Sequence, residues 1–264
     1  MTARENYEIW LKKADDADKA ELIALEGREK EIAERFSMPL AFGTAGMRGE
    51  VGIGTYRMNL YTVRRAARGV ASWINTLGET AKKKGVIISY DTRRFSYDFA
   101  FASAQVLKAA GIRSYVFENV RPVPLCSYAV RKLNAQAGIM ITASHNPKEY
   151  NGFKVYGSDG AQMSPEDTAE VVKYIDKTDY FDIPCEKTAP PVIKGMDNVA
   201  LDEFITVIGA SLDEEYYKEI EKLSLSDDAV KAFGGKLKLV YTPLHGSGAK
   251  PVTDILTRKG LNFS

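Results

Sequence analysis

The chain has 264 residues, with 36 basic and 35 acidic side chains, a net charge of +1 and 45% hydrophobic residues. This balance argues against a protein that coats nucleic acid, since such proteins are usually strongly basic, and it favours a globular domain with a sizeable core. The sequence has no apolar run that could span a membrane and no signal-peptide core, so we expect a cytoplasmic chain. Cys126 and Cys185 do not form a C-x-x-C pair, and we expect both to be free thiols.

Hydrophobic spacing predicts the secondary structure in chain order. Residues 7–36 predict a helical arm, and the Gly-rich segment 41–59 predicts a loop with strand edges. Short apolar runs predict strands over 86–90, 114–117, 138–142 and 153–156. Further helices are predicted over 60–77, 97–110 and 124–133, and another begins at Ser164. Strands that alternate with helices indicate an α/β fold, here a three-layer α/β/α domain with a mixed, largely parallel sheet.

The C-terminal part predicts a second, incomplete unit. The Pro-rich segment 188–192 has the composition of a linker. A helix over 198–223, a strand over 236–241 and a helix over 251–259 then begin a β-α pattern. We therefore expect a helical arm (1–40), a complete first domain (41–189) and the start of a second α/β domain (190–264).

Polar side chains gather in two loops near predicted strand ends, where α/β folds bind ligands. In the first loop, Thr44, Arg48 and three glycines offer a hydroxyl, a guanidinium and accessible amides, which suit a phosphate. A glycine-rich connector with a surface arginine would have the same composition. In the second loop, Asp91, Arg93 and Arg94 follow a predicted strand, and an ordinary salt bridge is the simpler interpretation.

A third loop, TASHNPKEYNGFKVY, runs from Thr142 to Tyr156. Ser144 and His145 are sequence neighbours and cannot easily meet as nucleophile and base, and the chain has neither a G-x-S-x-G elbow nor a nucleotide P-loop. What remains is a serine on a rigid turn, with Lys154 a short hairpin away. Such a serine could accept a phosphoryl group if cations screen the charge.

The third loop closely resembles the phosphoserine loop of the α-D-phosphohexomutases, the phosphoglucomutase and phosphomannomutase family. FGTAGMRG (42–49), YDTRRFS (90–96) and TPLHGSG (242–248) resemble other family segments, in the same order along the chain. The resemblance implies an isomerase in which Ser144 carries a phosphoryl group between the C1 and C6 hydroxyls of a hexose phosphate. Lys154 would assist proton transfer. Other implied roles are phosphate or substrate contacts by Thr44, Arg48, Asn146 and Arg93, active-site support by His145, and a structural role for His245.

The resemblance also implies Mg²⁺, bound by the phosphate on Ser144 and by an Asp-x-Asp-x-Asp loop, and a hexose 1,6-bisphosphate intermediate. The only D-x-D here is Asp16 to Asp18, in the predicted arm, where the two side chains would not share a helix face. We therefore expect an N-terminal portion of a longer enzyme, inactive alone. Its expected partners are a hexose phosphate and the remaining domains, with no nucleic acid and no membrane.

Two alternatives remain open at this stage. The chain could be a non-catalytic module that binds a sugar phosphate or a protein partner, or its parent could be a phosphopentomutase. A fragment should expose apolar surface, including Val240, Ile255 and Leu256, and should self-associate, whereas a module should be monodisperse in light scattering. The sequence also leaves the choice between glucose and mannose phosphates open.

Overall fold

The computed structural model describes residues 1–44, 46–244 and 246–264. Within these residues one seven-stranded sheet is formed by β1 (Gly46–Glu50), β2 (Val86–Tyr90), β3 (Ser114–Phe117), β4 (Ala137–Ile141), β5 (Tyr150–Tyr156), β6 (Val199–Ala200) and β7 (Ile205–Ile208). The strand order is β1-β5-β4-β2-β3-β7-β6. Four central strands, β4, β2, β3 and β7, are parallel, whereas β5 is antiparallel to both of its neighbours and β6 is antiparallel to β7. The prediction of a mixed, largely parallel sheet is confirmed.

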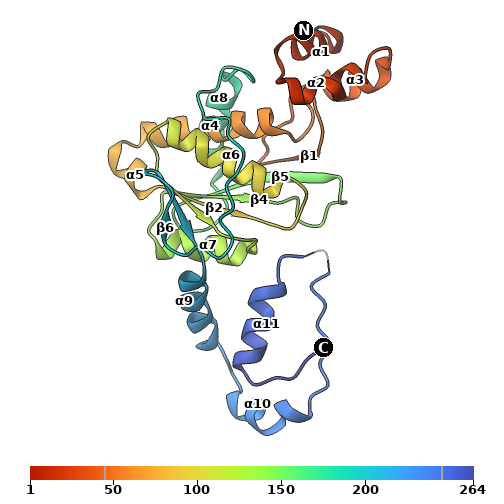
Figure 1. The fold of residues 1–264 in the computed structure, drawn as a ribbon. Coiled ribbons are helices and arrows are strands. Elements are labelled where there is room, and N and C mark those ends of the chain that lie inside the picture. Colours follow the sequence, from red (N-terminus) through yellow and green to blue (C-terminus); the bar gives the residue numbers. More distant parts are fainter. Residues whose placement is uncertain (45, 245) are drawn as a thin grey trace.

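Helices cover both faces of this sheet (Figure 1). One layer contains α4 (Leu60–Thr76), α6 (Ser96–Ala109) and α8 (Pro165–Asp176), and the other contains α7 (Val123–Lys132) and α9 (Ala210–Glu221), while the short α5 (Glu79–Lys84) leads into β2. Each face has its own apolar core. Because β2 and β4 are buried between the two helical layers, their sequences are apolar apart from Ser89 and show no polar alternation. The three-layer architecture is confirmed.

The helix starts follow the capping residues in the sequence. The Asn59 side chain accepts a hydrogen bond from the backbone N–H of Thr62 to begin α4, and the Thr62 hydroxyl accepts one from the backbone N–H of Asn59. The Ser164 hydroxyl accepts from the backbone N–H of Asp167, and Pro165 occupies the first turn of α8. The predicted beginning of α8 at Ser164 is confirmed.

The N-terminal arm predicted over 7–36 is helical, but its helix is not continuous: it consists of α1 (Ala3–Lys13), α2 (Asp16–Ile23) and α3 (Glu29–Phe36). Extended backbone at Ala14 separates α1 from α2, and Gly27, at a φ of 76°, separates α2 from α3. Trp10 packs edge-on against Phe36 and against Tyr61 of α4, which attaches the arm to the main domain.

The predicted helix over 198–223 is also wrong, because its first part forms β6 and β7. All four residues of the run Ile-Thr-Val-Ile in β7 are β-branched. Asp202 caps the start of the strand by accepting hydrogen bonds from two backbone N–H groups, and Gly209 separates the strand from α9. The Pro-rich segment before it runs along α6, where Tyr97 donates to the carbonyl of Pro191 over 2.6 Å. The sheet of the first domain therefore extends to Ile208, past residue 189.

A buried ion pair attaches α9 to the sheet. The Arg121 guanidinium, which follows β3, donates two hydrogen bonds of 2.7 Å to the two carboxylate oxygens of Asp213 on α9. A third bond of 2.8 Å goes to Glu118. Arg121 and Asp213 are each only 1% exposed, so the pair lies out of contact with water.

Beyond α9, the described residues contain α10 (Asp227–Phe233), the 3₁₀ turn η1 (Gly234–Lys236) and α11 (Ala249–Arg258). The predicted strand over 236–241 is wrong, since among these residues its only ladder contact is a single bridge between Leu239 and Phe263. An apolar run forms a strand only where neighbouring strands pair with it. The prediction of exposed apolar surface is confirmed at Val240, which is 80% exposed, whereas Ile255 and Leu256 are half-buried.

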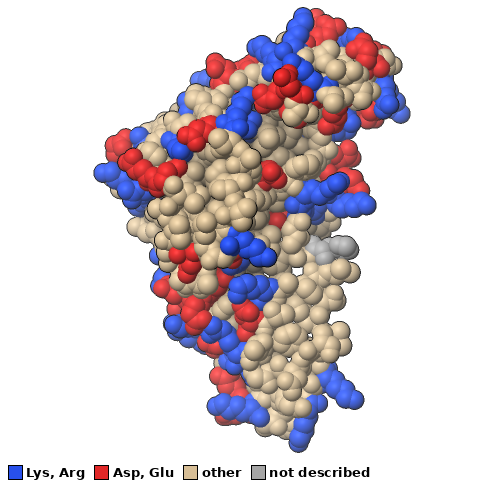
Figure 2. All heavy atoms as spheres, viewed as in Figure 1, with Lys and Arg blue, Asp and Glu red and all other residues tan. Residues whose placement is uncertain are grey.

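Basic and acidic side chains alternate over the visible face of the molecule, without one broad basic patch (Figure 2). This distribution accords with the near-zero net charge. In the residues that the structure describes, none of the helices combines the length and the apolar character needed to cross a membrane.

Candidate functional site

Ser144 lies in the loop between β4 and β5, on the turn that the sequence singled out. Its backbone has a φ of 59°, a left-handed conformation that is uncommon for a serine, and its side chain is exposed. The backbone N–H of Ser144 donates to the hydroxyl of Thr142 over 2.9 Å. The turn therefore holds the Ser144 hydroxyl at the surface of the domain.

His145 lies closer to Ser144 than the sequence suggests. Ser144 Oγ and His145 Nδ1 are 3.4 Å apart, so these neighbouring side chains are in contact, although the sequence argued against their meeting as nucleophile and base. We attribute the contact to the left-handed backbone at Ser144, which changes the direction of its side chain relative to an extended strand. At this distance the interaction is a long hydrogen bond.

Arg48 and Lys154 come from paired strands. In the β1–β5 ladder, Arg48 is opposite Gly152 and Gly46 is opposite Lys154, so both cationic residues are on one face of the sheet. Glycine at position 152 is required there, because an added Cβ would lie 2.5 Å from the carbonyl oxygen of Thr142 and 3.1 Å from Cγ of Arg48. The two cations are therefore neighbours although they lie far apart in the sequence.

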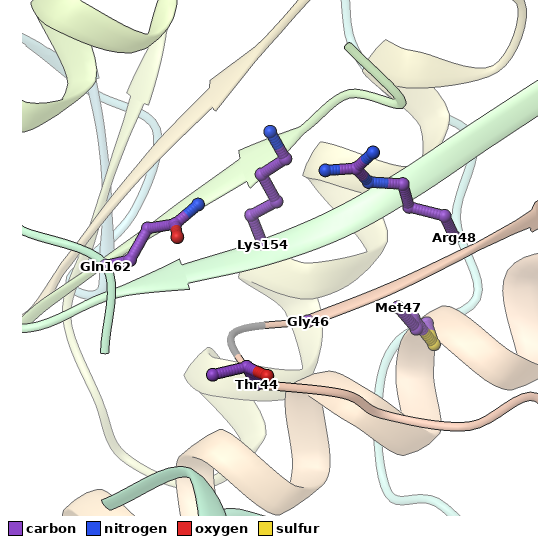
Figure 3. A pocket seen from close by; sticks show the side chains of 6 residues that line it. All are labelled: Thr44, Gly46, Met47, Arg48, Lys154 and Gln162. Atoms are coloured by element: carbon purple, nitrogen blue, oxygen red, sulfur yellow. The ribbon is translucent and has the colours of Figure 1, made fainter. Parts of the chain in front are cut away.

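These two cations line a pocket of about 220 Å³ together with Thr44, Gly46, Met47 and Gln162. Figure 3 shows Lys154 between Arg48 and Gln162, whose polar ends both extend toward it. Thr44 contributes from the loop before β1, and its carbonyl accepts a hydrogen bond from Thr168 of α8. The pocket offers a guanidinium, an ammonium, an amide and a hydroxyl, which is a suitable set for a phosphate.

The sequence did not point to Gln162, which reaches the pocket through the turn after β5. Residues 157–160 reverse the chain, and Gln162 forms a bridge with Tyr156. The sequence Gly-Ser-Asp-Gly at 157–160 is itself typical of a turn and consistent with a hairpin. Counting residues from that turn would have placed Gln162 beside β5, but not in a pocket with Arg48.

Asn146 connects the pocket with the segment 142–151, which contains Ser144 and is called the serine loop below. Its side-chain oxygen accepts a hydrogen bond of 3.4 Å from Arg48, and it lies two residues after Ser144. A larger groove of about 630 Å³ is lined by both the serine loop and the loop after β2, including Ser144, His145, Asn146 and Arg93. The residues that the sequence singled out in this half of the chain thus line two hollows. Thr44, Arg48 and Lys154 line the pocket, Ser144, His145, Asn146 and Arg93 line the groove, and the bond between Arg48 and Asn146 connects the two. His245 lies outside the described residues.

The amine of Lys154 has a shifted pKa. Burial lowers the pKa of this amine from its ordinary value, and the positive charge of Arg48 lowers it further, while Asp91 opposes both effects. A lowered pKa increases the fraction of neutral amine at a given pH. The amine is therefore better suited to accept a proton than an exposed lysine would be.

Replacing Arg48 by methionine is expected to raise the pKa of Lys154, because it removes a neighbouring positive charge. The measurement is a pH titration of the chain after reductive ¹³C-methylation, followed by NMR of the Lys154 amine. The control is Arg113→Met, which should leave the pKa of Lys154 unchanged. Arg113 is exposed and directly precedes β3, which is separated from β5 in the sheet by β4 and β2. If the pKa of Lys154 in the wild type had its ordinary value and did not change in Arg48→Met, the amine would be fully solvated and the expected effect of Arg48 would be wrong.

The described residues do not form a complete metal site. They contain no group of three or more His, Cys, Asp and Glu side chains that could hold an ion. The Asp91 carboxylate behind the serine loop is already engaged by the backbone N–H of Arg93 and by the Ser96 hydroxyl. A phosphate on Ser144 would offer oxygen ligands, but no set of carboxylates described here accompanies it.

Comparison with known proteins agrees with this fold and site. The family model described as "Phosphoglucomutase/phosphomannomutase, alpha/beta/alpha domain I" matches residues 39–181, more than half of the chain. The chain therefore belongs to the phosphoglucomutase/phosphomannomutase family.

Curated relatives include phosphoglucomutases of two staphylococci. The Staphylococcus epidermidis protein is 38% identical over 235 residues, covering 89% of this chain and 40% of its own length. The Staphylococcus aureus protein is 36% identical over 269 residues, covering 99% of this chain and 44% of its own length. This chain thus spans less than half of the length of the relatives it matches.

Solved structures share the fold. A Thermus thermophilus protein, provisionally assigned as a phosphomannomutase, superimposes with a TM-score of 0.63 at 26% identity, over 86% of this chain and 45% of its own. Parafusin, a phosphoglucomutase from Paramecium in its open form, has the same TM-score of 0.63 at 20% identity, over 84% of this chain and 42% of its own. At that lower identity the likeness concerns the fold alone.

Proposed function

We propose that the whole protein containing this chain is a phosphohexomutase, an isomerase that interconverts hexose 1-phosphate and hexose 6-phosphate through a phosphoserine at Ser144. The observation that carries the proposal is the geometry of Ser144. It is an exposed serine on a left-handed turn, linked through Asn146 to the cationic pocket of Arg48 and Lys154. The relatives named phosphoglucomutase support glucose phosphate as the preferred substrate.

In the proposed reaction, the bond between phosphorus and Ser144 Oγ breaks while a sugar hydroxyl oxygen bonds to the same phosphorus. The proton of that hydroxyl passes to Lys154, whose lowered pKa favours the neutral amine. Lys154 then gives up this proton to Ser144 Oγ, which leaves Ser144 as a free hydroxyl and Lys154 neutral again. The product is a hexose 1,6-bisphosphate. Its other phosphate then returns to Ser144 by the reverse of these steps, so that the phosphate has changed position on the sugar.

The surrounding polar groups have supporting roles in this proposal. Arg48 and Thr44 would bind the equatorial oxygens of the transferring phosphoryl group, where charge stabilisation matters most. Asn146 would orient Arg48 through their hydrogen bond, and His145 would contact the Ser144 hydroxyl or the substrate.

The family implies a metal cofactor, and we propose that it is Mg²⁺, with the Ser144 phosphate as one ligand. The ion would stabilise negative charge on the phosphoryl group when it is bound. The described residues do not by themselves make up a magnesium site, so the steps above involve only groups of this chain. We further propose that the protein is cytoplasmic, that its remaining domains supply the other ligands, and that the chain divides into an arm, a first domain and the start of a second.

The test is an assay of the whole protein with glucose 1-phosphate, mannose 1-phosphate and ribose 1-phosphate, combined with peptide mapping around Ser144. We expect conversion of glucose 1-phosphate to glucose 6-phosphate and a phosphate on Ser144. Faster turnover of ribose 1-phosphate would replace the hexose proposal by a pentose one. The mutase proposal would be wrong if no sugar phosphate were converted and Ser144 carried no phosphate.

A further inference from the structure

The side chain of Arg93 is directed into the serine loop. Its Nη1 donates to the carbonyls of Pro147 and Tyr150, over 2.7 and 2.8 Å. Its Nη2 donates to the carbonyls of Ser144 and Asn146, over 2.9 and 2.6 Å. One guanidinium therefore joins four main-chain carbonyls within seven residues of a single loop.

The fifth N–H of this guanidinium, on Nε, lies beside a carboxylate. Nε of Arg93 lies 3.4 Å from a carboxylate oxygen of Asp91, whose other oxygen accepts hydrogen bonds from the backbone N–H of Arg93 and from the Ser96 hydroxyl. Arginine has five N–H donors and no acceptor. Four of the five donate to carbonyls and the fifth lies beside Asp91, so no donor of this guanidinium is directed at a phosphate in this arrangement.

A second contact holds the same two loops together. The buried Asn151, at the other end of the serine loop, donates to the carbonyl of Arg94 over 2.9 Å and to the Ser96 hydroxyl over 3.0 Å. The loop after β2 thus holds the serine loop near both ends of the serine loop, at Ser144 through Arg93 and at Asn151 through Arg94. Such a support is needed because left-handed backbone at a residue like Ser144 is unfavourable and persists only where neighbouring groups impose it.

We propose that Arg93 is a positioning residue, which holds the Ser144 turn in its left-handed conformation and so sets the direction of the reacting hydroxyl. This role differs from the phosphate contact that the sequence resemblance implies for Arg93. It rests on the proposed function only in so far as Ser144 is the reacting group. A lysine could keep the charge but could not join four carbonyls in one plane.

The first test measures hydrogen exchange by mass spectrometry on the 264-residue chain and requires no enzymatic activity. In Arg93→Lys, we expect amides of residues 143–150 to exchange about tenfold faster or more, while β2 and α4 exchange as in the wild type. The matched control is Arg94→Lys, since the Arg94 side chain is exposed and takes no part in these hydrogen bonds. It should leave exchange in the serine loop unchanged.

The second test separates positioning from phosphate binding in the whole protein. For Arg93→Lys, we expect kcat to fall about 100-fold with KM within about threefold of the wild type, because a misplaced nucleophile affects the reacting geometry more than substrate affinity. For Arg93→Ala, added guanidinium ion should restore part of kcat.

The outcomes of the two tests are distinguishable. Unchanged exchange in the serine loop of Arg93→Lys, or a large rise in KM with kcat intact, would overturn the positioning role. If exchange responds as expected but the wild-type protein converts no sugar phosphate, the proposed function fails while the role of Arg93 in holding the turn stands. If Arg93→Lys disturbs exchange throughout the sheet, Arg93→Gln with guanidinium rescue decides, and lack of rescue counts against the proposal.

Discussion

Replacement of Ser144 by alanine is expected to lower the mutase activity of the whole protein by at least about 10³-fold, because no other group at this position could carry the phosphoryl group. The fold should not change, since the Ser144 side chain is exposed and its backbone contacts do not depend on the hydroxyl. The measurement is kcat with glucose 1-phosphate, together with the intact mass of the protein after incubation with glucose 1,6-bisphosphate. The wild type should gain one phosphate and the variant none.

A serine elsewhere in the first domain provides the matched control. Ser158 is exposed in the turn after β5, outside the pocket and the groove, and Ser158→Ala should retain both activity and phosphate uptake. If Ser144→Ala kept a large share of the activity, or still gained a phosphate, another residue would have to be the phosphoryl carrier. The phosphoserine mechanism would then be wrong for this protein.

Replacement of Arg121 by methionine is expected to destabilise the chain by about 3–5 kcal/mol, because it leaves the buried carboxylate of Asp213 without its main partner. Burial opposes the charge of Arg121, but the hydrogen bonds and the charge of Asp213 outweigh it and raise the pKa of the guanidinium. A loss of this size is a large part of the stability of a typical domain, about 5–15 kcal/mol. Urea unfolding followed by circular dichroism measures it.

Two further variants show whether the loss comes from the unpaired charge. The double variant Arg121→Met with Asp213→Leu should recover more than half of the lost stability, since apolar residues can replace a buried pair. Lys132→Met breaks an exposed ion pair between α7 and the same helix α9 and should leave the unfolding midpoint close to that of the wild type. If Arg121→Met also left the midpoint unchanged, the pair would contribute little to the attachment of α9.

Much of the first domain could be predicted because its local signals are strong. The buried strands β2 and β4 are short runs that are apolar apart from Ser89, and the helix α8 begins with a serine cap and a proline. In contrast, residues 199–221 have an apolar spacing compatible with a helix, and only pairing with β3 makes the run at 205–208 a strand. The opposite error occurred at 236–241: the sequence Lys-Leu-Lys-Leu-Val-Tyr predicted a strand, but among the described residues only a single bridge, between Leu239 and Phe263, pairs with it.

The candidate site was also only partly visible. Ser144, His145 and Lys154 could be selected because they share one short and specific segment. Gln162 could not, because its place beside Lys154 depends on how the turn after β5 folds back. For Arg93 the residue type suggested a phosphate contact, whereas in the structure four of its donors bond to main-chain carbonyls and its Nε lies in an ion pair with Asp91.

By itself, the sequence determined the fold class, the family resemblance and the residue types available for phosphoryl transfer, because periodicity, capping and motif spacing are local properties of the chain. Only the tertiary structure decided which of these groups meet and in what orientation. The pairing of β1 with β5 puts Arg48 beside Lys154, and the loop after β2 holds Ser144 in a left-handed turn. Both arrangements depend on contacts between residues some fifty to a hundred positions apart, and such contacts arise only when the sheet has formed.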